Sequence, residues 1–131
     1  MNDEKPNWVI EKLNIAIAEL LKASPKRTTQ EITIACFGLA FKPDIDDLRE
    51  SPALEITKTI ANQHPGRVLA VEPNIENNPF TELENVELVN IEKAFELADI
   101  ILVLVDHKEI KELRIPRKNI KIIDTRGIKL L

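Results

Sequence analysis

Glycine is scarce in this chain. The 131 residues contain only Gly38, Gly66 and Gly127, whereas average usage of about 7 % would give roughly nine. These three are too far apart to form a G-x-G-x-x-G or Walker A loop, whose glycines let the backbone approach phosphate groups closely. The composition therefore excludes a self-contained dinucleotide-binding or P-loop enzyme.

Aromatic residues and positive charges are also few. The chain has four phenylalanines, one tryptophan and no tyrosine, and 22 acidic residues outnumber 18 Lys and Arg, for a net charge of −4. An acidic chain with few rings for bases to stack on is not expected to bind nucleic acid. Hydrophobic residues make up 44 % and charged residues 31 %, which is typical of a folded globular protein of about one domain.

The single cysteine, Cys36, lies in an apolar run and is interpreted as a buried small hydrophobic residue, not a reactive thiol. His64 and His107 do not have the spacing of metal ligands, so no metal site is predicted. No apolar stretch approaches 18 residues and the N-terminus has no signal-peptide pattern, so we expect no membrane partner and a cytoplasmic location.

Residues 6–23 are predicted to form a helix, because Ile10, Leu13 and Ile17 recur at helical spacing. Trp8 and Ile15 widen its apolar surface beyond one stripe. Such a helix either packs only on its own sheet or also contacts a second domain or chain. The apolar pattern does not decide between the two. A polar connector follows, so the chain divides into an appendage, residues 1–29, and a domain, residues 30–131.

Strands and helices alternate through this second part. Continuous apolar runs are typical of strands buried on both faces of a parallel sheet. The predicted order is strand 32–37, helix 51–62, strands 67–71 and 86–89, helix 91–97, strand 100–105, a helical turn 107–113 and strand 120–124. This alternation predicts an α/β, Rossmann-like three-layer domain with a mostly parallel sheet, preceded by the N-terminal helix.

Ligands of such sheets bind beyond the carboxyl ends of the strands. Lys42 and Arg49 follow the first strand, and Arg126 follows the last. Their convergence near a helix N-terminus would suit a phosphate or diphosphate. From composition alone, local ion pairs with the acidic residues interleaved between Lys42 and Arg49 are favoured over a bound anion as the explanation. Glu72 and Asp106 also lie at strand ends. They could meet a sugar hydroxyl, but we interpret them as capping or solvated side chains.

Order and spacing in one stretch carry more information. Residues 37–53, FGLAFKPDIDDLRESPA, closely resemble the C-terminal, UDP-binding domain of the UDP-glucose/GDP-mannose dehydrogenase family. Shorter segments at residues 7–9, 71–74, 104–107 and 123–127 resemble the branch of that family that acts on UDP-N-acetyl-D-mannosamine. Members of the family are NAD-dependent enzymes that oxidise the C6 alcohol of a nucleotide-linked sugar twice, giving a uronic acid.

The resemblance implies roles for individual residues. Phe41 and Lys42 would contact the UDP-sugar, Arg126 would be a further substrate contact, and Arg49 would reach the NAD cofactor. The helix 6–23 would be the end of a central helix through which the enzymes form homodimers. UDP-N-acetylmannosaminuronate, the implied product, serves surface polysaccharide synthesis.

The rest of the family's machinery is missing from these 131 residues. The dinucleotide-binding domain, which would hold most of the NAD, and the motif of the catalytic cysteine do not occur. No catalytic residue is therefore predicted, and the chain alone is expected to bind UDP-sugar without oxidising it. Two alternatives stay open: a stand-alone non-catalytic module for oligomerisation or regulation, and the same domain from a dehydrogenase of another UDP-sugar.

Overall fold

The computed structural model describes residues 4–38, 52–72, 84–104 and 120–124. These ranges contain three α-helices, one short 3-10 helix and five strands. In chain order the elements are α1 (Glu4–Ala23), η1 (Thr29–Glu31), β1 (Ile34–Phe37), α2 (Pro52–Gln63), β2 (Val68–Val71), β3 (Val86–Leu88), α3 (Ile91–Leu97), β4 (Ile100–Val103) and β5 (Lys121–Asp124).

The five strands form one sheet in the order β3-β2-β1-β4-β5, and all four pairings are parallel. In the central register, Cys36 of β1 lies between Ala70 of β2 and Leu102 of β4. The chain moves outward from β1 to β3 and then returns across the sheet to β4. The switch point of the topology is therefore between β1 and β4, as in dinucleotide-binding folds.

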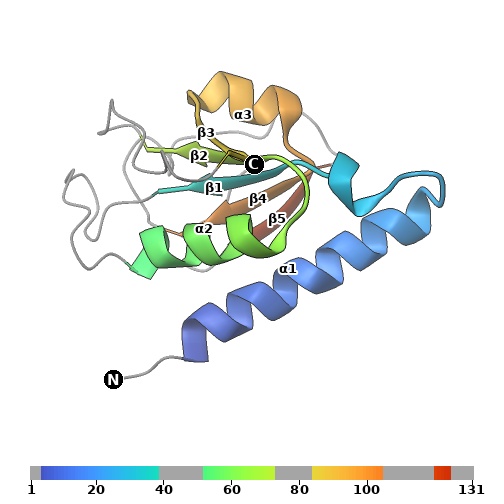
Figure 1. Ribbon diagram of the computed structural model, residues 1–131, viewed down its shortest axis with the longest axis horizontal. Coiled ribbons are helices and arrows are strands. Elements are labelled where there is room, and N and C mark those ends of the chain that lie inside the picture. Colours follow the sequence, from blue (N-terminus) through green and yellow to red (C-terminus); the bar gives the residue numbers. More distant parts are fainter. Residues whose placement is uncertain (1–3, 39–51, 73–83, 105–119, 125–131) are drawn as a thin grey trace.

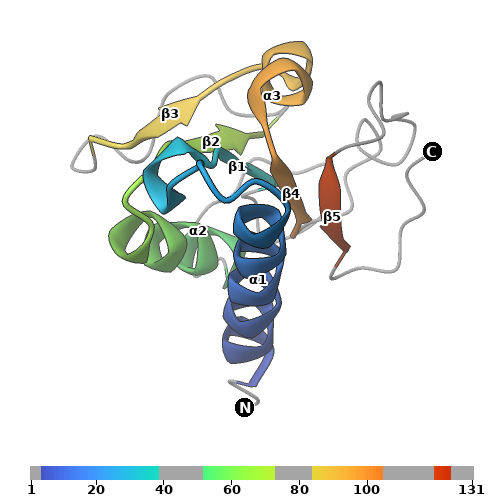
Figure 2. The same cartoon turned by 90° about the vertical axis from the view of Figure 1, so that its right-hand side faces the viewer.

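Helices cover both faces of the sheet, which gives three layers (Figures 1 and 2). Ile34 and Cys36 face the layer of α1 and α2, where Ile56 and Ile60 are also buried. Ala35 and Phe37 face α3, where they pack with Ala94 and Phe95. This alternation follows from the period of two in a strand, and it confirms the predicted α/β three-layer architecture.

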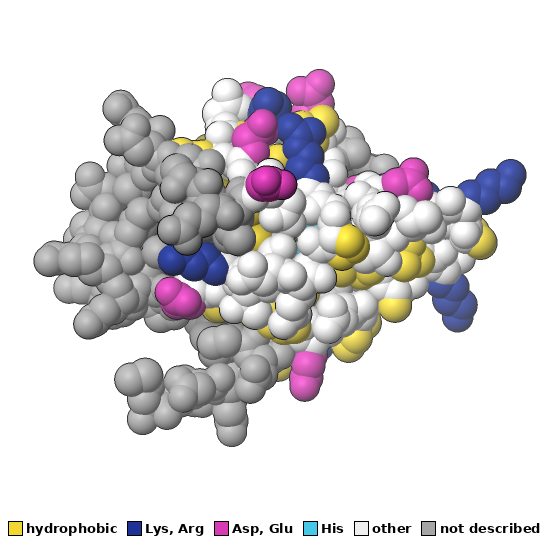
Figure 3. All heavy atoms as spheres, viewed as in Figure 1, with side chains coloured by type: hydrophobic (Ala, Val, Ile, Leu, Met, Phe, Trp, Pro, Cys, Tyr) yellow, Lys and Arg dark blue, Asp and Glu magenta, His cyan; other side chains and the backbone are white. Residues whose placement is uncertain are grey.

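Helix α1 packs on the sheet through Val9, Leu13 and Ala16, all at most 7 % exposed. Its other side keeps Trp8 43 % and Ile15 55 % exposed, and apolar side chains lie along it in Figure 3. The helix therefore does pack on its own sheet, and it retains apolar surface outside that contact. Within the residues that the structure describes, no helix combines the length and hydropathy needed to cross a bilayer.

The connector after α1 is fastened to the start of β4 by Asp99. One oxygen of its carboxylate accepts hydrogen bonds from the Arg27 guanidinium and from the backbone N–H of Thr33, each at 2.9 Å. The Thr33 carbonyl in turn accepts from the backbone N–H of Asp99 at 2.8 Å. The hydrogen bond from Arg27 to Asp99 also raises the pKa of the guanidinium. These contacts fix how the chain enters β1.

The turn between α2 and β2 is held by two side chains. The Asn85 amide donates to the carbonyl oxygens of Ala61, His64 and Gly66 at 2.9, 3.1 and 3.1 Å. These carbonyls belong to the end of α2 and the turn after it, where helix carbonyls lack partners. His64 is buried, and its Nε2 lies 2.7 Å from the Ile32 carbonyl oxygen. The end of α2 is thereby joined to the start of β1.

The structure shifts the bounds of the predicted elements slightly. Helix α1 begins two residues earlier than predicted, and β1 begins two residues later because η1 occupies the approach to it. Asn90 caps α3 as its position predicts, accepting from the Lys93 backbone N–H at 2.8 Å. The predicted helical turn at 107–113 and residue 51, the predicted start of the helix 51–62, lie outside the described residues.

Candidate functional site

The carboxyl edge of the sheet is the candidate site, since the switch point lies there between β1 and β4. Gly38 directly follows β1 and has a φ of 95°, a left-handed conformation that glycine adopts without strain. Its backbone N–H donates to the Val71 carbonyl at 2.7 Å, and the Leu104 N–H donates to the Phe37 carbonyl at 2.9 Å. The end of β1 is thus hydrogen-bonded to the ends of both neighbouring strands.

The predicted site residues lie outside the described residues. Phe41, Lys42 and Arg49 follow Gly38 in the chain, Asp106 follows β4, and Arg126 follows β5. The parallel pairing of β1, β4 and β5 brings the ends of these three strands to one edge. The starting points of the segments with Lys42 and Arg126 are therefore on the same edge, while their side-chain contacts stay predictions.

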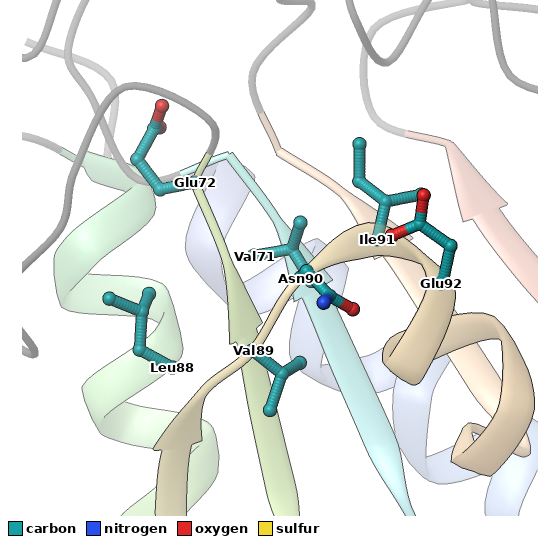
Figure 4. Close-up of a pocket in the computed structure, with 7 residues that line it drawn as sticks. All are labelled: Val71, Glu72, Leu88, Val89, Asn90, Ile91 and Glu92. Atoms are coloured by element: carbon teal, nitrogen blue, oxygen red, sulfur yellow. The ribbon is translucent and has the colours of Figure 1, made fainter.

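A pocket of about 360 Å³ opens at this edge beside β2. Val71 and Val89 form its apolar wall, and Glu72, Asn90 and Glu92 bring polar groups. Figure 4 shows Glu72 extending from the end of β2, and Glu92 from the first turn of α3. Carboxylates accept hydrogen bonds from hydroxyl groups and repel phosphates. Among the described residues that line the pocket, the charged ones are both carboxylates, so these residues favour a hydroxyl-bearing group over a diphosphate.

Burial decides part of one expectation from the sequence. Glu72 is only 4 % exposed, so of the two roles predicted for it, a capping or a solvated side chain, the solvated one is wrong. The strand-end position alone does not reveal this burial. Nothing in the sequence pattern singled out Glu92 or the pocket, since both depend on how β3 and α3 pack beside β2.

Charges on the described surface are interspersed (Figure 3). Arg67 of the turn before β2 and Lys93 of α3 both reach Glu87 of β3, at 2.8 and 3.4 Å. The hydrogen bond from Arg67, with a weaker one from Lys93, lowers the pKa of the Glu87 carboxyl. All three side chains are nearly half exposed, so these ion pairs contribute little to stability.

Cys36 is fully buried in the middle of β1, as predicted. Loss of water around the sulfur raises the pKa of its thiol to about 12, and a hydrogen bond with Thr57 opposes this to a smaller extent. The thiolate form that reacts with electrophiles is therefore nearly absent at neutral pH. Among the described residues, no group of three or more His, Cys, Asp or Glu side chains is placed to hold a metal ion.

We expect Cys36 to resist thiol reagents in the folded protein. At pH 8 its reaction with a chromogenic disulfide should be slower than that of an ordinary cysteine by a factor on the order of a thousand, from the thiolate fraction alone. The measurement is stopped-flow absorbance, with the same protein in concentrated guanidinium chloride as the control. Complete labelling of folded protein within minutes would contradict the buried thiol.

The sequence profile described as "UDP-glucose/GDP-mannose dehydrogenase family, UDP binding domain" matches residues 35–129. The chain belongs to the UDP-glucose/GDP-mannose dehydrogenase family. The matched range begins in β1 and includes β5, so the profile extends over the whole described sheet.

Individual members of the family are similar over almost the whole chain. The UDP-N-acetyl-D-mannosamine dehydrogenase of Yersinia pestis is 47 % identical over 131 residues, covering 98 % of this chain and 30 % of that protein. The NDP-N-acetyl-D-galactosaminuronic acid dehydrogenase of Ralstonia solanacearum is 46 % identical over 129 residues, covering 98 % and 28 %.

Solved structures agree with this membership. The UDP-N-acetyl-mannosamine dehydrogenase of Staphylococcus aureus superposes with a TM-score of 0.63 at 26 % identity, covering 94 % of this chain and 27 % of that one. The chain thus spans less than a third of the length of the family members that it matches. The resemblance seen in residues 37–53 is confirmed at the level of the family.

Proposed function

We propose that this chain is the UDP-sugar-binding part of an NAD-dependent UDP-N-acetyl-D-mannosamine 6-dehydrogenase. The observation that carries the proposal is 47 % identity with the Yersinia pestis enzyme of that name over almost the whole chain. Residues 30–131 form the UDP-sugar-binding domain in this proposal. Residues 1–29 contain the end of the central dimerisation helix and the connector.

The nucleotide is proposed to bind at the carboxyl edge of the sheet. Phe41 and Lys42 from the segment after β1 and Arg126 from the segment after β5 would contact the UDP-sugar. Arginine offers a planar pair of donors and lysine a compact charge, so the two can bind different oxygens of one diphosphate. Support comes from the strand order, which places the ends of β1, β4 and β5 together at the switch point.

The described residues do not fit NAD. A dinucleotide needs a glycine-rich turn between its first strand and helix, whereas Gly38 is the one glycine between the end of β1 and the start of α2. We propose that a part of the enzyme outside this chain holds NAD and that Arg49 reaches it from here. The hydride acceptor is then bound outside this chain. We therefore expect the 131-residue chain alone to form no NADH from UDP-N-acetylmannosamine.

We further propose that the parent enzyme is a cytoplasmic homodimer formed through the helix of residues 6–23. Trp8 and Ile15 remain exposed on α1 after it has packed on the sheet. Contiguous exposed apolar surface of this kind marks interfaces between proteins.

The binding proposal predicts a clear effect of two substitutions. Lys42→Ala and Arg126→Ala should each weaken UDP binding by about 10- to 100-fold, because a hydrogen bond to a charged group contributes about 1.5–3 kcal/mol. Isothermal titration calorimetry of the 131-residue chain with UDP is the measurement. Lys26→Ala is the matched control, since Lys26 is exposed in the connector after α1. Equal affinity in all variants would contradict the assignment of these residues.

A second sugar deserves a direct comparison, because the Ralstonia solanacearum relative is almost as similar. Calorimetry with UDP-N-acetylmannosamine and UDP-N-acetylgalactosamine separates the two candidates. The proposal expects the mannosamine derivative to bind more tightly than UDP alone and more tightly than the galactosamine derivative. The reverse order would favour the second sugar while keeping the nucleotide site.

A further inference from the structure

A buried histidine fastens the end of α2 to the approach of β1. His64 directly follows α2 and is only 6 % exposed. Its Nε2 lies 2.7 Å from the Ile32 carbonyl oxygen, and its backbone N–H donates to the Ile60 carbonyl at 2.8 Å. A carbonyl can only accept, so Nε2 carries a proton. The ring therefore joins two segments that are 32 positions apart in the sequence.

The second nitrogen of the ring has no partner. Nδ1 of His64 is buried, and among the described residues no group forms a hydrogen bond with it. In the neutral ring, Nδ1 is an acceptor that is left unused. A second proton would make it a charged donor with neither water nor an acceptor beside it, and a buried charge without such partners is strongly unfavourable. The site that the ring occupies therefore fits the neutral imidazole and not the imidazolium.

Close packing prevents the ring from shifting toward the turn after α2. A Cβ on Gly66 would lie 2.7 Å from His64 Nε2 and 2.9 Å from the Ile32 carbonyl oxygen. The Asn85 amide donates to the carbonyls of His64 and Gly66 at 3.1 Å each, and it holds this turn in place. A protonated ring therefore has no room on this side in which to find a new partner.

The cleft between α1 and α2 lies on another side of His64. It has a volume of about 240 Å³, and His64 is one of the residues that line it. The two helices lie side by side on the same face of the sheet (Figures 1 and 2). Leu13 and Asn14 of α1, Thr29 of η1 and Gln63 of α2 also line the cleft. Among the described lining residues of these elements and of the turn after α2, none except His64 is titratable or charged. The lining therefore has no carboxylate that would hold a protonated ring in place.

We propose that His64 is a proton-operated latch between α2 and the approach to β1. The neutral ring stays buried and donates to the Ile32 carbonyl. When the ring takes up a second proton from solvent, it turns out into the cleft, where water solvates both N–H groups and the C-terminal end of α2 favours the positive charge. The Ile32 carbonyl then loses its donor, and the junction between α2 and β1 loosens. The latch does not depend on the proposed nucleotide function.

The stability of the fold should record this latch as a dependence on pH. An imidazole in an unfolded chain is half-protonated at about pH 6.5. Below that pH the unfolded chain binds one more proton than the folded chain with its latch closed, so acid favours unfolding. His64→Gln is the matched variant, because its amide can donate to the Ile32 carbonyl and does not titrate. Between pH 8 and 5.5 the unfolding equilibrium constant should rise up to about 10-fold more in the unmodified chain than in His64→Gln.

Urea denaturation of both 131-residue chains at each pH measures the difference. Every other titratable group is common to the two proteins, so its effect cancels in the comparison. An equal response of the two proteins to pH would overturn the proposal, because the folded chain would then accept the imidazolium at no cost.

NMR of the unmodified chain tests the opening itself, and it does so even if His64→Gln does not fold. At pH 8 the ring nitrogens should show a neutral imidazole with its proton on Nε2. Protonation on lowering the pH should shift the amide signals of Ile32 and Gly66 together with the ring signals. Ile17→Trp, which fills the cleft, should move this change to lower pH. A proton on Nδ1 at pH 8, a protonated ring with both amide signals in place, or an unaltered titration in Ile17→Trp would each contradict the latch.

Discussion

Replacing Gly66 by alanine is expected to lower the free energy of unfolding by about 3 kcal/mol, the upper end of the usual cost of forcing atoms into a packed site. An ideal Cβ at this position would lie 2.7 Å from the Gln30 carbonyl oxygen, 2.7 Å from His64 Nε2 and 2.9 Å from the Ile32 carbonyl oxygen. Two of these atoms belong to the backbone entering β1, so they cannot rotate away as the end of a long side chain would.

The damage should extend beyond the clash itself. The Gly66 carbonyl accepts from the Asn85 amide, which also holds the end of α2. A backbone shift at Gly66 therefore weakens the turn and the His64–Ile32 hydrogen bond together. Each such bond contributes about 1 kcal/mol. In a domain whose total stability is about 5–15 kcal/mol, the loss is a large fraction.

Urea denaturation followed by circular dichroism measures this change, with the slope m compared between proteins. The double variant His64→Ala with Gly66→Ala is the control, because it removes one of the three close contacts. The double variant should lose less stability than the sum of the two single losses, because one of the three clashes is gone. The two backbone clashes should still keep it less stable than the unmodified chain. A loss below about 1 kcal/mol for Gly66→Ala would show that the turn relaxes freely, contrary to the packing described.

The fold was predictable from local signals. The apolar runs that became β1 and β4 have neighbours on both sides in a parallel sheet, so every position is buried and hydrophobic. Asn90 precedes a helix because its side chain satisfies a backbone N–H of the first turn. Such signals act within a few residues, which is why they can be read from sequence.

Long-range contacts could not be predicted in the same way. The Asp99 carboxylate bonds Arg27 across 72 positions, and Asn85 reaches Ala61 across 24. No local pattern distinguishes these polar residues from solvated ones. The burial of Glu72 and, among the described residues, the unpaired Nδ1 of His64 are likewise not visible in the local sequence pattern.

The candidate site could be predicted from the sequence only in part. Its place at the carboxyl edge follows from the parallel sheet alone, and the membership of the family follows from the order of residues in 37–53. The roles of Lys42 and Arg126 remain predictions, because the acidic composition near Lys42, taken alone, favours local ion pairs over a bound diphosphate. Only the binding measurement described above decides between them.

Phe37→Ala is expected to cost about 3–5 kcal/mol, the usual range for removing a buried aromatic side chain. Phe37 is fully buried on the α3 face of the sheet, and its ring centroid lies 5.6 Å from that of Phe95, with the planes tilted by 38°. The pair joins β1 to α3. Alanine would leave a cavity lined by residues of the sheet, which the parallel strands can close only in part. Phe37→Leu, which keeps most of the volume, should cost about 1.5 kcal/mol or less.

This residue also connects stability with the proposed nucleotide site. Phe37 immediately precedes Gly38, and its carbonyl accepts from the Leu104 N–H at the switch point. A loosened β1 end should therefore weaken UDP binding several-fold, even at low temperature where the variant is folded. Leu13→Ala is the stability-matched control, because Leu13 is buried on α1 in the other cluster and should cost about 2–5 kcal/mol. If UDP affinity falls equally in both variants, Phe37 contributes to stability alone; if it falls only in Phe37→Ala, the end of β1 is what positions the nucleotide-binding segment.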